Sequence, residues 1–300
     1  TAQLAVTGGR DPVVRVWDIT SGECCAELRG HTDEVWAVDI TNNGQHVVGA
    51  GRNGCILVWD LATQRLVHRL IGHFGPVTSV AISEQSHTLV SGGWDTTVRV
   101  WDLNDGQQKR CFEGHTVRVL DVSFNDQLKL VASSSGLVPD VDGLLPSQLL
   151  HASEVRIWSL DGRCKMAEKS HQIGDIGGVF GVLSSAVHGV KISLQGRIAL
   201  SAGHDGHICI WDLETLSLLK TLYAHSSPVL SIAVDSQARV AISGSIDQTV
   251  RIWDLRGHAP PPLPLKRRVG RVGVPARAGQ LRKAFLIWTN SRVRRWLVFP

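Results

Sequence analysis

The sequence predicts an all-β fold made of repeated four-stranded antiparallel sheets. Three observations support this: short runs alternate apolar and polar residues, Trp-Asp pairs recur at a regular spacing, and Gly-His pairs recur between them. The stretch from Gly72 to Asp102 shows all three, because it opens with Gly-His, closes with Trp-Asp and holds three alternating runs. Alternation at period two in Val, Thr and Trp is typical of β-strands. One such sheet cannot bury its own apolar face, so the fold requires copies of it.

Tryptophans set the period of these copies. Trp-Asp pairs begin at Trp17, Trp59, Trp101, Trp211 and Trp253, with an imperfect copy at Trp158. The successive spacings are 42, 42, 57, 53 and 42 residues. A histidine follows 13 or 14 residues after five of them, at His31, His73, His115, His171 and His225. A period in the low forties between a Gly-His and a Trp-Asp end is typical of a propeller blade of four strands.

The chain therefore resembles the WD-repeat (tryptophan–aspartate repeat) β-propeller family from about Leu4 to Leu255. The resemblance implies an all-β WD-repeat β-propeller of four-stranded antiparallel blades, with six recognisable repeats. At this period, 300 residues suffice for about seven blades. We therefore expect a degenerate seventh blade and an incomplete closure of the ring.

We divide the chain into three parts. Residues 1–255 are the predicted propeller, whose first blade lacks its innermost strand at the N-terminal end. Residues 256–282 are a predicted basic linker or an alternative coding tail, because prolines between Pro260 and Pro264 forbid ladder strands. Residues 283–300 partly recover the repeat pattern and are expected to form a degenerate strand pair. The chain also begins in mid-blade without Met, which suggests a piece of a longer protein.

Alternating runs place the strands in order. The first blade has predicted strands at Leu4–Gly8, Val13–Asp18 and Cys24–Leu28. The second has runs at residues 35–40, 46–51, 56–60 and 65–70, and the third adds an outer strand at 107–112. The sixth blade runs regularly from His225 to Asp254.

Two insertions lengthen the fourth and fifth blades, at about residues 136–152 and 173–186. In WD-repeat propellers the affected loops emerge on one face, called the top face, so the resemblance places both insertions on one rim. Both are rich in Leu, Val and Ile, which is unusual for solvated loops. They either pack on each other as a small lid or form part of a partner-binding site.

Charge is divided unevenly along the chain. Residues 256–300 hold 11 of the 31 basic residues and none of the 27 acidic residues. Residues 1–255 therefore hold 20 basic and 27 acidic residues. The propeller is therefore acidic and the tail is basic. The 11 positive charges of the tail could neutralise phosphates, but little aromatic interleaving and an acidic propeller weigh against a specific nucleic-acid site.

Repeated polar residues are interpreted as structural and not as catalytic. A histidine, a serine and an aspartate resemble a hydrolase triad, but the set recurs with a tryptophan in several blades, and an enzyme does not build one active site per blade. In the WD-repeat family these types form a hydrogen-bonded network that satisfies buried polar groups. The sets are His73, Ser91, Asp95 and Trp101; His171, Ser201, Asp205 and Trp211; and His225, Ser243, Asp247 and Trp253.

Three blades depart from this network. The first has Thr7, Asp11 and Trp17 without a histidine in the chain. The second has Gly49 and Asn53 where serine and aspartate are expected, and the insertion in the fourth removes its turn aspartate. We expect these blades to open more easily than the third and the sixth.

Motifs for other chemistry are missing from the sequence. There is no phosphate-binding loop, zinc-protease helix or dinucleotide fingerprint, so we expect no catalytic residue, cofactor or metal. The six cysteines show no C-x-x-C pair and are interpreted as free thiols in a reducing cytoplasm or nucleus. No apolar run is long enough to predict a membrane span.

The resemblance implies a partner-binding surface on the top face. The family's positions there lie just before the innermost strand, one residue into it, and just before the turn aspartate. They correspond to Glu34, Trp36, Pro76, Thr78, Arg118, Leu120, His188 and Leu230, and to Arg10, Arg52, Trp94, His204 and Ile246. Trp36 and Trp94 lie outside the periodic Trp-Asp series, although Trp94 also precedes an aspartate, so they either anchor a partner or fill the central channel.

These features favour a non-catalytic scaffold that binds protein or peptide partners on the top face. The alternative is the sensor or substrate-recognition region of a larger protein, either a nucleotide-switch ATPase or a ubiquitin-ligase subunit. The sequence leaves the partner and the oligomeric state open.

Overall fold

The computed structural model describes residues 4–83, 85–136, 154–160, 164–166, 186–193, 197–235, 237–257, 283–289 and 293–299. Most of the two insertions and the linker, and the expected network residue His171, lie outside these residues. None of the described residues forms a helix that is long and apolar enough to cross a membrane.

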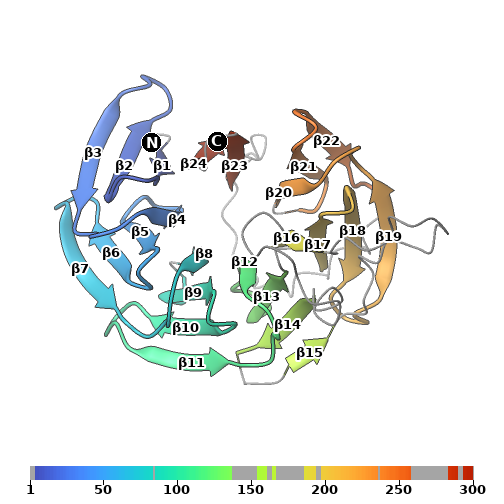
Figure 1. The fold of residues 1–300 in the computed structure, drawn as a ribbon, viewed down its shortest axis with the longest axis horizontal. Coiled ribbons are helices and arrows are strands. Elements are labelled where there is room, and N and C mark those ends of the chain that lie inside the picture. Colours follow the sequence, from blue (N-terminus) through green and yellow to red (C-terminus); the bar gives the residue numbers. More distant parts are fainter. Residues whose placement is uncertain are drawn as a thin grey trace, which may run out of the picture.

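All described regular structure is β-strand, arranged as sheets around a central axis (Figure 1). The first sheet has three strands, β1 (Leu4–Thr7), β2 (Val13–Asp18) and β3 (Cys24–Arg29). The second has β4 (Val35–Ile40), β5 (His46–Gly51), β6 (Ile56–Asp60) and β7 (Arg65–Leu70). The third has β8 (Val77–Ser83), β9 (Thr88–Gly93), β10 (Val98–Asp102) and β11 (Gln108–Phe112).

The fourth sheet has β12 (Val119–Asn125), β13 (Leu130–Ser135), β14 (Val155–Ser159) and β15 (Cys164–Met166). The fifth has β16 (Val187–Ile192), β17 (Ile198–Gly203), β18 (His207–Asp212) and β19 (Leu218–Tyr223). The sixth has β20 (Val229–Val234), β21 (Val240–Ser245) and β22 (Val250–Asp254). The last has β23 (Lys283–Thr289) and β24 (Val293–Phe299), which lie between β20 and β1 (Figure 1).

Every blade is a meander in which sequence neighbours pair antiparallel. In four blades the pairing of the third and outer strands shifts directly before the tryptophan, as between Val100 and Trp101. Such a bulge increases the local twist of the strand. The all-β propeller predicted from the repeat is therefore the observed architecture.

The apolar core lies between neighbouring blades. Trp101 of β10 is 2% exposed and packs in one cluster with Ile56 and Val58 of the preceding blade. Trp59, Trp158 and Trp211 occupy the corresponding clusters between their own blade and the one before it. Truncating a buried aromatic side chain of this kind costs about 3–5 kcal/mol. These contacts hold the sheets in radial order.

Gly92 on β9 allows the third blade to approach the fourth closely. A Cβ atom at Gly92 would lie 2.5 Å from Cγ1 of Val119 and 2.8 Å from Cγ1 of Val122. Gly244 has the same repeat position in β21, where the described atom that its Cβ would meet is the hydroxyl of Ser231, at 3.1 Å and within its own blade. Among the described side chains, the close approach to the next blade is therefore seen at Gly92 and not at Gly244.

We expect Gly92→Ala to lower the free energy of unfolding by about 1–3 kcal/mol, because the added methyl group overpacks the blade interface. Gly244→Ala is the matched control and is expected to change stability by less than about 1 kcal/mol. Urea denaturation followed by tryptophan fluorescence measures both. An equal loss in the two variants would contradict a close approach specific to Gly92.

Candidate functional site

A buried serine joins a histidine and a tryptophan in the third blade. Ser91 on β9 accepts the indole N–H of Trp101 at 2.9 Å, and its hydroxyl lies 2.8 Å from Nε2 of His73. The other ring nitrogen of His73 lies 2.9 Å from Oδ1 of Asp95. The four side chains connect β9, β10 and the loop that leads into the blade.

The aspartates at the ends of these networks are held in their ionised form. Burial by itself would raise the pKa of Asp95, but hydrogen bonds led by that with His73 outweigh it and lower the pKa. In the sixth blade, burial of Asp247 is likewise outweighed by hydrogen bonds with Thr249 and His225, so its pKa is also lowered.

These distances resemble those of a hydrolase triad, but the groups are inaccessible. Ser91 is 0% exposed, and so is the side chain of His73. The indole N–H of Trp101 also occupies the serine oxygen. Because a substrate cannot reach this hydroxyl, the arrangement acts as a cross-link that satisfies buried polar groups.

The network recurs in the sixth blade and in part in the fifth. In the sixth, Nδ1 of His225 lies 2.8 Å from Asp247, and Ser243 bonds both Nε2 of His225, at 2.8 Å, and the indole of Trp253, at 2.9 Å. In the fifth, Ser201 accepts the indole N–H of Trp211 at 2.8 Å, and a carboxylate oxygen of Asp205 lies 3.4 Å from Nδ1 of His207.

In the second blade the histidine lacks this network. His31 is 7% exposed, and neither ring nitrogen has a hydrogen-bond partner among the described residues. Gly49 supplies no hydroxyl, and the amide of Asn53 donates to Thr32 at 3.0 Å instead. Burial lowers the pKa of His31 to about 4; the backbone of Gly49 opposes this without forming a hydrogen bond of normal geometry.

In the fourth blade a glutamate missed by the sequence interpretation lies beside the histidine. Oε2 of Glu154 is 3.9 Å from Nδ1 of His115 but only 2.7 Å from Nε of Arg156, which holds it. Nε2 of His115 lies 2.6 Å from Ser133, which accepts the indole N–H of Trp158 at 2.8 Å. Burial, with the nearby charge of Arg156, lowers the pKa of His115 to about 3.

One repeated backbone bond brings the expected top-face positions together. In the second to sixth blades, a backbone N–H in the turn between the second and third strands donates to the carbonyl of a residue just before the innermost strand. The donor–acceptor pairs are Arg52–Glu34 at 2.9 Å, Trp94–Pro76 at 2.9 Å, Gly136–Arg118 at 3.2 Å, His204–Ala186 at 2.8 Å and Ile246–Pro228 at 3.1 Å. This backbone hydrogen bond therefore fixes the relative positions of the Cα atoms that carry these side chains.

Three consecutive blades contribute one continuous group of side chains, the aromatic–arginine cluster of Trp36, Trp94 and Arg118. The two indole rings meet edge to face, with centroids 5.3 Å apart and an interplanar angle of 63°. The guanidinium carbon of Arg118 lies 3.8 Å from the centroid of the Trp94 ring, which is a close cation–π contact. The indole N–H of Trp36 donates to Glu34 at 2.9 Å. All four side chains are half-buried.

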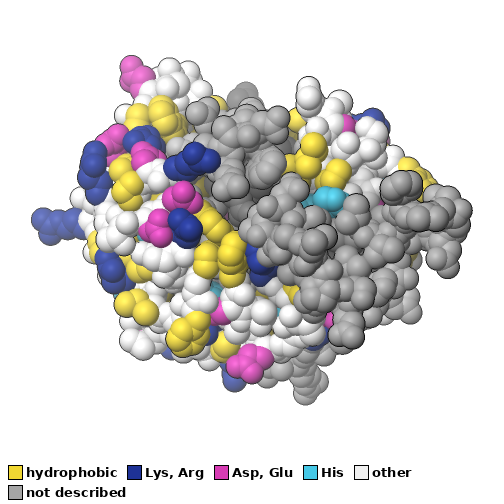
Figure 2. Space-filling view, viewed as in Figure 1, with side chains coloured by type: hydrophobic (Ala, Val, Ile, Leu, Met, Phe, Trp, Pro, Cys, Tyr) yellow, Lys and Arg dark blue, Asp and Glu magenta, His cyan; other side chains and the backbone are white. Residues whose placement is uncertain are grey.

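Figure 2 shows hydrophobic, basic and acidic side chains next to one another over the region of β4, β5 and β8. Arg10 and Arg52 are exposed, and Ile246 is 47% exposed. The remaining expected positions are half-buried: Pro76, Leu120, His188, His204 and Leu230. Within this group Nε2 of His188 lies 3.2 Å from Nδ1 of His204, so the fifth blade forms a separate histidine pair.

Thr78 was expected on the partner-binding surface, and this expectation is wrong. Its side chain is 1% exposed, and its hydroxyl hydrogen-bonds the carbonyl of Gly92 at 2.9 Å and that of Val119 at 2.6 Å. The short side chain connects the third blade to the fourth and presents no surface to a partner.

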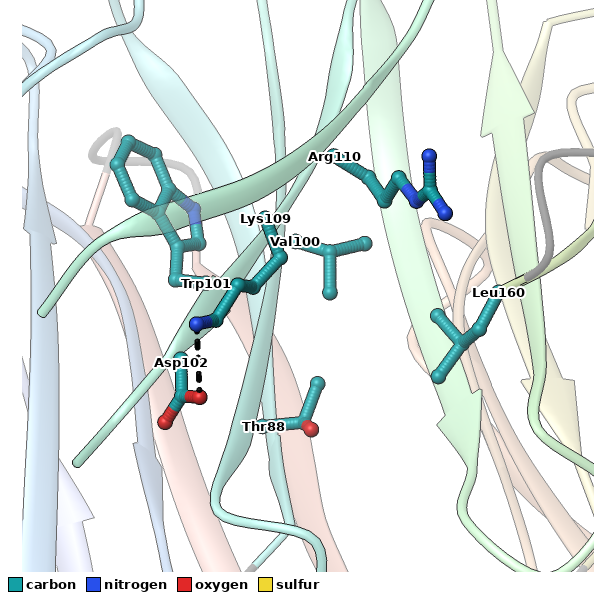
Figure 3. A pocket seen from close by; sticks show the side chains of 7 residues that line it. All are labelled: Thr88, Val100, Trp101, Asp102, Lys109, Arg110 and Leu160. Atoms are coloured by element: carbon teal, nitrogen blue, oxygen red, sulfur yellow. Dashed lines mark ion pairs between the residues drawn. The ribbon is translucent and has the colours of Figure 1, made fainter. Parts of the chain in front are cut away.

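A shallow cleft of about 150 Å³ lies where the third and fourth blades meet (Figure 3). It is lined by Thr88, Val100, Trp101, Asp102, Lys109, Arg110 and Leu160. The ammonium group of Lys109 in this lining is neutralised, because its Nζ lies 3.2 Å from a carboxylate oxygen of Asp102 and 3.2 Å from one of Asp105. The cleft is smaller than usual ligand pockets and its lining holds no acid–base pair of the kind catalysis needs. Among the described residues, no group of three His, Cys, Asp or Glu could hold a metal ion.

The family model described as WD domain, G-beta repeat matches residues 22–60, 64–102, 106–143, 179–212 and 216–254. These segments cover more than half of the chain, and four of them end at the aspartate of a Trp-Asp pair. The chain belongs to the WD-repeat family. WD-repeat domains generally mediate protein–protein interactions and are typically non-catalytic. No curated protein matches the chain.

We expect Ser91→Ala to destabilise this WD-repeat propeller by about 2–4 kcal/mol, because it leaves the indole of Trp101 and a ring nitrogen of His73 buried without a partner. Ser226→Ala, at an exposed serine, is the control and should cost less than about 0.5 kcal/mol. Urea midpoints measure both. A Ser91→Ala cost as small as that of the control would show that the serine is not the centre of the network.

We expect the free energy of unfolding to fall as the pH is lowered from 7 to 4.5. The folded pKa values of His31 and His115, about 4 and about 3, lie below the unfolded value of about 6.5. The unfolded chain therefore binds more protons below pH 6.5, and stability present above that pH is lost as the pH falls toward the folded values.

His115→Gln should reduce this slope by up to about 1.4 kcal/mol per pH unit, whatever it does to stability at pH 7. Urea unfolding at pH 7, 6, 5 and 4.5 measures the slope for the wild type and the variant. Parallel pH profiles would contradict a buried neutral imidazole at this position.

Proposed function

We propose that this propeller is a non-catalytic scaffold that binds peptide or protein partners on its top face. The observation that carries the proposal is the aromatic–arginine cluster, in which Trp36, Trp94 and Arg118 from three consecutive blades contact one another. Tryptophan and arginine are the residue types most enriched where interfaces concentrate their binding energy.

The cluster is held by rigid structure. Trp36 lies on β4 with its indole N–H bound to Glu34, and Trp94 is fixed by its backbone bond to Pro76. Because these side chains are already ordered, a partner would lose little additional side-chain entropy on binding. The two rings are half-buried, and the exposed Arg52 is joined by its backbone N–H to the carbonyl of Glu34 in the second blade.

Two other places in the described residues could suggest catalysis, and both support it less well. The triad-like groups are buried, and the cleft between the third and fourth blades is small and carries a neutralised ion pair. A docking surface for a peptide or protein therefore fits the described residues better than a site for turnover.

The test compares the double variant Trp36→Ala, Trp94→Ala with Val67→Ala, Leu219→Ala, a control that removes two exposed apolar side chains from outer strands. Partners captured by each protein are quantified. The top-face variant should retain at least one group of partners at least tenfold less than the wild type, and the control should retain those partners fully. Circular dichroism verifies that both variants fold. Identical partner profiles for the wild type and the top-face variant would reject the proposal.

A further inference from the structure

The sixth blade exposes apolar side chains along the edge of its last strand. Its sheet has three strands, and no fourth strand pairs with β22 among the described residues. Val250 is 64% exposed and Ile252 is 73% exposed, although both lie on the third strand of the blade, which in four-stranded blades is covered by an outer strand. β22 is the outermost strand of its sheet in Figure 1.

Counterparts of these two residues are buried in the five other blades whose third strands have described side chains. Three residues before each blade's tryptophan, the position of Val250, the exposed fractions are 0% for Val14, Ile56, Val98 and Ile208 and 6% for Val155. One residue before the tryptophan, the position of Ile252, they are 0% for Val16, Val58 and Ile210, 2% for Ile157 and 4% for Val100. In each of those blades an outer strand pairs with the third strand, whereas none of the described strands pairs with the free side of β22.

The four outer strands with described side chains pair in one common register. The residue at the Val250 position pairs with a large apolar residue, as Val14 with Leu28, Ile56 with Leu70, Val98 with Phe112 and Ile208 with Leu222. The residue at the Ile252 position pairs with a small or basic one, as Val16 with Ala26, Val58 with His68, Val100 with Arg110 and Ile210 with Lys220.

The chain thus contains four examples of the segment that fits this edge. In three of them a basic residue is followed two positions later by Leu or Phe, and in the fourth Ala takes the place of the basic residue. The anchoring Leu or Phe is buried in three of the four strands, at 1% for Leu28 and Leu70 and 5% for Phe112, and Leu222 is half-buried.

We propose that the edge of β22 binds an extended segment of a partner protein by antiparallel strand addition. The segment carries Leu or Phe opposite Val250 and, two residues earlier, a basic residue opposite Ile252. Backbone hydrogen bonds to this edge, with which no described strand pairs, supply most of the attraction, and the apolar anchor sets the register. This site lies on the outer edge of the sixth blade and is independent of the top face.

The expected affinity is modest. In the third blade Phe112 also stacks on Trp158 of the following blade, with ring centroids 5.1 Å apart and planes 11° apart. At β22 the anchor gains its contact with Val250 and Ile252 without a described tryptophan on its other side. We therefore expect dissociation constants in the micromolar range, typical of short segments added to a sheet edge.

The probe is a fluorescent peptide with the sequence of residues 217–224, which contains the chain's own pair Lys220 and Leu222. It should bind the full chain in an anisotropy titration and protect amides of residues 249–254 from hydrogen exchange. The neutral double variant Val250→Asn, Ile252→Asn should bind at least tenfold more weakly, and so should a peptide with Leu222→Asp paired with the wild-type protein. Val67→Asn is the matched control, because Val67 is an exposed apolar residue on an outer strand that already completes its blade.

Three outcomes would overturn the proposal: no binding, equal binding to the wild type and the double variant, or protection only outside β22. Light scattering that shows a dimer abolished by the double variant would assign the edge to a second copy of the chain instead. Weaker peptide binding by Trp36→Ala would place the peptide on the top face. Unchanged binding by Trp36→Ala is expected, so failure of this site and failure of the top-face scaffold remain distinguishable.

Discussion

The structure depends on the packing of third-strand tryptophans from the second blade onward against the preceding blade. Trp101 shows the principle, because its ring lies among Ile56 and Val58 of the second blade while its N–H is bound inside its own. One side chain thus satisfies a polar requirement within a sheet and an apolar requirement between sheets. This double role explains why the tryptophan recurs with the period of the fold. In the sixth blade, where no described strand pairs with β22, the third strand exposes apolar side chains.

Polar side chains in this propeller show that geometry alone does not define an active site. His73, Ser91 and Asp95 have distances that would suit a hydrolase, but their burial makes them a structural network. Where the network is incomplete, the fold uses other means. The second blade leaves His31 neutral within packed surroundings, and the fourth brings Glu154 near His115 from the residue directly before its third strand.

Departures from the repeat also mark the two surfaces proposed to bind partners. Trp36 and Trp94 are not required by the period, and Arg118 covers the second of them from the next blade. On β22 the residues follow the period and what differs is the absence of a pairing strand among the described residues. One surface therefore arises from unusual residues on regular backbone, and the other arises from regular residues on an unusual edge.

The sequence alone determined the strand order, the antiparallel blades and the polar network of the third and sixth blades, because blade contacts repeat with one period. It also singled out Trp36 and Trp94. Only the tertiary structure decided that these indoles touch, that Thr78 is buried against the next blade and that Glu154 reaches toward His115. Each of these depends on how one sheet is rotated against its neighbour or on where an inserted segment rejoins it. The alternation of apolar and polar residues along a strand predicts which face of the sheet a residue is on. It does not predict which side chains of the adjacent blade that residue contacts.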